Sequence, residues 1–452
     1  MPDRILAALE RLRQDLSRTL DRDAVLQECQ AHHYRGRTRT LDPLMTVHVF
    51  LTQVLHHNAA LTHLPRIVGL SFTASAFCQA RLRLPLAVLQ GLLRRVADAL
   101  RPEIDQVGRW CGHRTFLADG STFSMPDTPE LQAHFGQSRK AKPGCGFPVA
   151  HLMVLFHAGT GVLLEAFATP LHGHDLSLAG RLHPCLRAGD VLVGDRGFCS
   201  FAHLATLMGR QLHAVLRLHQ RQIVDFTPGR RHTTTRGTDA AAKGLPRSRW
   251  VRTIGPEDHV VAWLKPATLP RWMTRAEYAL LPAEILVREL RYRTEKPGFR
   301  TRVVTLVTTL LDEKRYDGLA LSGLYRQRWE VETHLRELKQ GLGLDVLKCR
   351  SVAGVTKELT AFALVYNLVR VVMGEAARDQ GQAVSRISFA DALRWLATWR
   401  VGDPRPRLVI NAERPERVDA RVIKRRPKNY PWMSKPRSEL RKAILEQGKC
   451  LT

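Results

Sequence analysis

Residues 325–339 read YRQRWEVETHLRELK, and this stretch predicts a helix with two stripes of different chemistry. At about 100° per residue, Tyr325, Arg328, Glu332 and Lys339 fall within one arc of roughly 60°, although they span four turns. The neighbouring arc is apolar, as in a helix packed on a core. Its members are Leu324, Val331, Leu335, Leu338 and Leu342. The polar face is therefore expected at the edge of the core.

This polar face has two interpretations. A carboxylate beside a hydroxyl, a guanidinium and an ammonium suits a site for a metal and a phosphate, because the acid holds the cation and the bases hold phosphate oxygens. The same face also fits solvated ion pairs at i,i+4 spacing. Since charged helix faces are common, this helix alone favours the second interpretation.

Two further acids each follow a short apolar run. Asp119 follows the apolar run TFLA and precedes Gly120, and Asp195 follows VLVG and precedes Arg196. We expect each carboxylate at or near the end of a buried strand, where open sheets place their active sites. Taken singly, each is better explained as a turn or cap aspartate.

A second possible ligand set is weaker. His172 and His174 in LHGHDL could form a metal-binding pair. A helix cap at Asp175 explains this segment more simply.

The order of the expected elements predicts a mixed α/β fold with additions. Residues 1–110 read as helices, and a helix-turn-helix region is expected around the break at Pro85. Short β-rich runs from about residue 114 alternate with helices, and residues 221–300 read as antiparallel strands inserted into this pattern, the last of which could join the main sheet. Two groups of arginines in the helical region could meet phosphates or merely form a basic surface. They are Arg81, Arg83, Arg94 and Arg95, and Arg35, Arg37 and Arg39.

Composition indicates a nucleic-acid partner. The 452 residues carry a net charge of +27, which attracts a polyanion. Residues 421–442 alone hold nine Lys or Arg against one acid, with Tyr430 and Trp432 interleaved. Such a tail suits phosphate binding and base stacking, although it could also be merely solubilising. We find no signal peptide, no run of 18 apolar residues and no CxxC pair, and we expect a cytoplasmic protein.

Together these signals resemble the DDE transposases of the insertion sequence four family. The match lies in DGSTF with the following PDTPE, in GDRGFCS, and in the spacing Y-x2-R-x3-E-x6-K, which stand in the family's order. The tail RVIKRRPKNYPW is also similar. The resemblance covers roughly residues 70–435 and is weakest in the N-terminal helices.

The resemblance implies roles for six residues. Asp119, Asp195 and Glu332 look like the catalytic carboxylates that bind two Mg²⁺ ions, with Mn²⁺ as a possible substitute. The DNA-binding group that grips the transposon end looks like Tyr325, Arg328 and Lys339. All six positions match the family's pattern.

The implied fold is an α/β, ribonuclease H-like catalytic core with a β-rich insertion, a helical N-terminal DNA-binding region and a basic C-terminal tail. The expected parts are a helical DNA-binding region (1–110), the first part of the core (111–220), the β-rich insertion (221–300), the second part of the core with the catalytic helix (301–380) and the basic C-terminal region (381–452).

The implied function is metal-dependent cleavage of double-stranded DNA at transposon inverted-repeat ends, followed by strand transfer to target DNA in a cut-and-paste reaction by a homodimer. Two alternatives stay open. One is a DNA-binding protein that has lost catalysis, which would normally show a substituted carboxylate. The other is a ribonuclease H-like nuclease without strand transfer.

Overall fold

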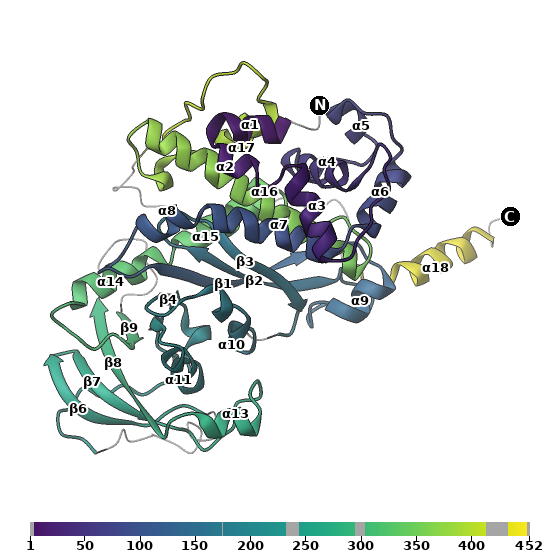
Figure 1. The fold of residues 1–452 in the computed structure, drawn as a ribbon. Helices are drawn as coiled ribbons and strands as arrows, with labels where there is room; N and C mark the ends of the chain where they lie inside the picture. Colours follow the sequence, from purple (N-terminus) through teal and green to yellow (C-terminus); the bar gives the residue numbers. More distant parts are fainter. Residues whose placement is uncertain (1–3, 174, 232–243, 294–302, 413–432, 450–452) are drawn as a thin grey trace.

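A single nine-stranded sheet runs through the molecule, with helices packed against it (Figure 1). The computed structural model describes residues 4–173, 175–231, 244–293, 303–412 and 433–449. The strand order is β3-β2-β1-β4-β5-β9-β8-β7-β6. A mixed α/β architecture, as the sequence predicts, is therefore confirmed.

The first five strands form one half of the sheet. Strands β1, β2 and β3 pair antiparallel, whereas β4 pairs parallel with β1 and β5 pairs parallel with β4. They span β1 (Thr115–Ser124), β2 (Val149–His157), β3 (Leu163–Pro170), β4 (Val191–Gly194) and β5 (His213–Arg217). The parallel connections carry α10 (Asp175–Leu178), with two short 3₁₀ turns, and α11 (Phe201–Gly209).

The inserted strands continue the same sheet. β9 (Val303–Thr308) pairs antiparallel with β5 on one side and with β8 (Glu284–Arg293) on the other. β7 (Asp258–Leu264) and β6 (Ser248–Gly255) follow outward, and α13 (Arg275–Leu280) lies beyond them. The expectation that the last strand of this region joins the main sheet is confirmed.

A layer of helices covers β3 and β2. The chain begins with α1 (Arg4–Leu12), α2 (Gln14–Ser17), α3 (Arg22–Ala31), α4 (Pro43–Leu55), α5 (Leu64–Val68), α6 (Ala74–Arg83), α7 (Leu86–Ala99) and α8 (Arg101–Gln106). Asp42 caps α4 by accepting a hydrogen bond from the Met45 amide, and Pro43 occupies the first turn. The break between α6 and α7 falls at Leu84 and Pro85, as expected.

Helix α16 (Val352–Asp379) ties this layer to the sheet. It packs against α4, α7 and α17 (Phe389–Thr398) and also against β3. Among the described residues it alone is long and apolar enough to cross a membrane, and 94% of its apolar window is buried inside the protein. It therefore serves as the central core helix.

The stretch at 325–339 is not one continuous helix, which corrects the sequence interpretation. α14 (Gly318–Gln327) ends at Arg328, α15 (Glu330–Arg336) follows Trp329, and a π-helical turn spans Glu337–Gly341. At the junction the amides of Arg328, Val331 and Glu332 donate to carbonyls three residues back, which tightens the turn.

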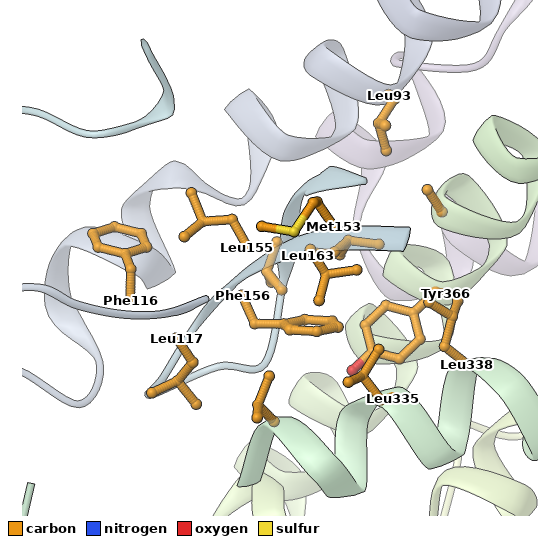
Figure 2. Close-up of a cluster of buried hydrophobic side chains, with 14 of the residues drawn as sticks. Leu93, Phe116, Leu117, Met153, Leu155, Phe156, Leu163, Leu335, Leu338 and Tyr366 are labelled. Carbon is orange, nitrogen blue, oxygen red and sulfur yellow. The ribbon is translucent and has the colours of Figure 1, made fainter. Parts of the chain in front are cut away.

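The apolar stripe of this stretch packs as predicted. All five of its leucine and valine side chains are buried. Figure 2 shows Leu335 and Leu338 on α15 and the following turn facing Phe156 of β2 and Tyr366 of α16. The ring centroids of Phe156 and Tyr366 are 5.6 Å apart. The catalytic-helix candidate is thus fixed on one face of the sheet.

The last described helix, α18 (Arg437–Lys449), extends away from the rest of the molecule (Figure 1). Tyr430, Trp432 and most basic residues of the predicted tail fall in 413–432, outside the described residues.

Candidate active site

The register of two parallel strands brings Asp119 and Asp195 together. Leu117 of β1 pairs with Val193 of β4, and each aspartate comes two residues later on its own strand path. Neighbouring strands are about 4.8 Å apart. Asp195 directly follows β4, as predicted, but Asp119 lies in the middle of β1, because β1 continues past β4 to pair with β2 as far as Ser124.

Backbone amides orient both carboxylates. Asp119 Oδ1 accepts a hydrogen bond from the Gly120 amide at 2.8 Å. Asp195 Oδ1 accepts one from the Gly197 amide at 2.7 Å, at the start of a 3₁₀ turn. The glycine after each aspartate is thus part of its local support.

The surroundings of the Asp119 carboxyl group disfavour its ionised form. Its pKa is raised to about 7, chiefly by burial and to a smaller extent by the charges of Asp195 and Asp175, while the Gly120 amide and Arg328 act in the opposite direction. A carboxylate in this state gains from any nearby cation.

Arg328 brings a positive charge to two of the three carboxylates. Its guanidinium lies 3.8 Å from Asp119 Oδ2 and 3.4 Å from Glu332 Oε1. It is also 4.8 Å from the ring centroid of Trp329, and its Nε is buried without a hydrogen-bond partner. Arg328 therefore bridges Asp119 to Glu332, whose side chain is 52% exposed.

Lys339 and Tyr325 border this group. Lys339 Nζ lies 3.3 Å from Ser121 Oγ and 3.2 Å from Asp345 Oδ1. Ser121 is two residues from Asp119 and so shares its face of β1. Tyr325 is 5% exposed, and burial raises its pKa to about 12, so the phenol stays protonated as a donor.

The donor set fits a hard divalent cation in its chemistry, because all three predicted ligands are carboxylates and Asp119 lacks full charge compensation. The carboxylates lie farther apart than the ligands of a single bound ion. In the part of the chain that the structure describes, no three His, Cys, Asp or Glu side chains lie close enough to hold one ion. The guanidinium of Arg328 lies between Asp119 and Glu332 and partly compensates the negative charge of both.

Sequence reasoning missed two neighbours of the site, His151 and Asp175. His151 Nε2 lies 2.7 Å from Asp175 Oδ1. The signal that could have revealed Asp175 is the pair Gly120 and Gly197, which follow Asp119 and Asp195 by one and two residues. Both glycines face Asp175. The possible His172 and His174 pair cannot be judged, because His174 lies outside the described residues.

Part of the expected phosphate-binding set is used internally. Arg81 packs over the rings of Phe50 and Phe77 and donates to Gln53 Oε1, and Arg95 donates to Glu28. Exposed arginines remain in the same region. They are Arg35, Arg37, Arg39, Arg83 and Arg94.

Comparisons with known proteins identify the family of the chain. Residues 110–368 match the family described as Transposase DDE domain. The chain is 26% identical to the transposase InsG for insertion sequence element IS4 of Escherichia coli K12 over 382 residues, which is 78% of this chain and 79% of that protein. It is 31% identical to a putative transposase, InsZ, of the same organism over 134 residues, 29% of this chain and 45% of that protein. Among solved structures, a piggyBac transposase synaptic complex with hairpin DNA matches with a TM-score of 0.42 and 10% identity, over 88% of this chain and 80% of that one.

The fold and site thus define a DNA-cleaving and strand-transferring enzyme of the DDE class. The chain belongs to the DDE transposases of the insertion sequence four family, which confirms the resemblance seen in its motifs. It is accordingly a DNA transposase.

Proposed function

We propose that Asp119, Asp195 and Glu332 are the catalytic carboxylates and that they hold two Mg²⁺ ions, with Mn²⁺ as a substitute. The observation that carries this proposal is the strand register that sets Asp119 beside Asp195, with Glu332 connected to Asp119 through Arg328. When bound, such ions activate the attacking oxygen and stabilise the leaving oxygen of a phosphodiester. The core carrying them has the ribonuclease H-like strand order, β3-β2-β1-β4-β5.

Three side chains of the same stretch position the DNA. Arg328 and Lys339 offer guanidinium and ammonium groups at the rim of the carboxylates, where a scissile phosphate has to lie. Tyr325 is buried and keeps its phenolic hydrogen, so its hydroxyl group can act as a hydrogen-bond donor to the DNA. If bound metal neutralised the carboxylates, the guanidinium of Arg328 would be available to a phosphate beside Asp119.

The remaining steps follow from the class of reaction. The substrate is double-stranded DNA with inverted-repeat ends, cut out and joined to target DNA by a homodimer. The N-terminal helices supply sequence-reading contacts and the basic tail supplies phosphate contacts, as the net charge of +27 favours. The protein acts in the bacterial cytoplasm, on the nucleoid.

Incubation with DNA that carries the flanking inverted repeats tests these assignments. With Mg²⁺ we expect cleavage at the repeat ends and joined products, and both should disappear in excess chelator. Cleavage without a divalent ion would overturn the metal assignment. Cleavage without joined products would favour a nuclease that lacks strand transfer.

A further inference from the structure

Asp175 approaches the catalytic carboxylates from the opposite face of the sheet. Side chains alternate along a strand, so Gly120 faces away from the side of β1 that carries Asp119. His151 of β2 pairs with Thr122 of β1 and lies on the Gly120 side. His151 in turn holds Asp175, the first residue of α10, at 2.7 Å.

Two glycines leave the space that Asp175 fills. A Cβ on Gly120 would collide with Asp175 Oδ1, and it would also lie 3.0 Å from His151 Cε1. A Cβ on Gly197 would lie 2.9 Å from Asp195 Oδ1 and 3.3 Å from Asp175 Oδ2. Oxygens of Asp175 and Asp195 therefore converge on the same small volume above Gly197.

His151 accounts for the placement of Asp175 Oδ1, but Asp175 Oδ2 and Asp195 Oδ1 both lie close to Gly197. Asp175 is 28% exposed, yet its Oδ1 is buried without a hydrogen bond of regular geometry, despite its short distance to His151. Its charge also acts against ionisation of Asp119. Like charges gathered in this way are costly unless a cation joins them.

We propose that Asp175 is a fourth carboxylate of the active site, which contributes an oxygen ligand to the cation on the Asp195 side. His151 positions it, and Gly120 and Gly197 give it room. This inference rests on the proposed metal-binding role of Asp119 and Asp195. It also explains the glycines of the motifs DGS and DRG, because Gly120 and Gly197 leave the room that the Asp175 side chain occupies.

Binding of Mn²⁺ to the full-length protein, followed by electron paramagnetic resonance of the free ion, tests the proposal without relying on activity. Asp175→Asn keeps the size of the side chain and removes its charge. We expect it to weaken Mn²⁺ binding roughly 10- to 100-fold, the range found when groups that support a metal site are changed. The control is Asp127→Asn, an exposed carboxylate beyond the end of β1, which should bind Mn²⁺ normally.

A second variant uses the glycine. Gly120→Ala should displace Asp175 and reproduce the loss of Mn²⁺ affinity, and adding Asp175→Asn should then cost little more, because the two changes act on one interaction. Circular dichroism and thermal unfolding establish that each variant is folded.

The outcomes separate this inference from the proposed function. If Asp175→Asn binds Mn²⁺ like the unmodified protein while Asp119→Asn does not, Asp175 has only a structural role with His151 and the inference fails. If Asp119→Asn and Asp195→Asn also bind Mn²⁺ normally, the proposed metal site itself is wrong. Additive losses in the glycine double variant would likewise contradict the inference.

Discussion

Asp119 lies within β1 and Asp195 directly follows β4, each two residues beyond the pair that Leu117 and Val193 form between these parallel strands. Their separation is therefore set by the backbone of the sheet. Glu332 reaches the same site from a helix and contacts Asp119 only through Arg328. The strand pair is the fixed part of the site, and the helical carboxylate is the part expected to adjust when metal binds.

The first prediction concerns Glu330 and Glu332, which are two residues apart on α15 and therefore lie on different sides of it. Glu332→Gln removes the anionic oxygen that a hard cation prefers, so DNA cleavage and joining should fall at least about a hundredfold, which corresponds to the several kcal/mol such a ligand supports. DNA binding should persist or tighten, since a negative charge near phosphate is lost. Gel-shift and cleavage assays in Mg²⁺ measure the two effects separately.

Glu330→Gln is the matched control. Burial raises the pKa of Glu330, so a neutral side chain of the same shape should be tolerated there. An active Glu332→Gln enzyme, or a folded but inactive Glu330→Gln enzyme, would show that the wrong side of α15 has been assigned to the metals.

The second prediction concerns pH. The pKa of Asp119 is about 7 in the folded protein, against about 3.9 for an unfolded aspartate. The folded state therefore binds more protons between these values, and the free energy of unfolding of the metal-free protein should fall as pH rises from about 4 to about 7. Thermal unfolding at a series of pH values measures this.

Asp119→Asn should lack that part of the pH dependence. Near pH 8 without metal, the variant should be more stable than the unmodified protein, and this advantage should disappear below about pH 4, where aspartate is protonated in both the folded and the unfolded state. Mg²⁺ should stabilise the unmodified protein at pH 8 and not the variant. Identical pH profiles for both proteins would contradict the assignment of the raised pKa to Asp119.

The third prediction concerns salt and metal in DNA binding. The chain carries a net charge of +27, so the logarithm of the binding constant should decline linearly with the logarithm of salt concentration, with a slope of about 0.9 for each phosphate neutralised. Excess chelator should leave binding intact while it stops cleavage. A binding constant that does not respond to salt would exclude the proposed electrostatic contacts.

The fourth prediction concerns the tail. A chain ending at residue 420 lacks nine basic side chains and two aromatic rings present in 421–442. DNA affinity should fall at least about tenfold, since one stacked base contributes about 1–3 kcal/mol, while Mn²⁺ binding should be unchanged. A chain ending at residue 432 is the comparison, because it loses α18 but keeps both rings. If the shorter chain bound DNA as well as the complete one, the tail would be merely solubilising.

The sequence predicted the elements that local patterns specify. The β-rich runs expected from about residue 114 correspond to the first strands of the sheet, and the break expected at Pro85 is the boundary between α6 and α7. The π-helical turn after Arg336 could not be predicted, because a regular helical wheel assumes one constant rotation per residue. Tertiary packing of Leu338 and Leu342 into the core accompanies this departure.

The sequence names candidate site residues, but their geometry could not be predicted from it. The motif spacing named Asp119, Asp195 and Glu332, yet nothing local indicates that Arg328 separates two of them. Asp175 escaped for a similar reason: its approach depends on the pairing of β1 with β2 and on contacts between segments more than 50 residues apart. Such relationships are properties of the assembled sheet.

Strand β9 is hydrogen-bonded to β5 on one side and to β8 on the other. A swing of the inserted strands relative to the catalytic carboxylates would have to break several backbone hydrogen bonds at once. The two halves of the sheet are therefore expected to move as one unit. When the transposon end enters, we expect the bending and local unpairing to occur in the DNA.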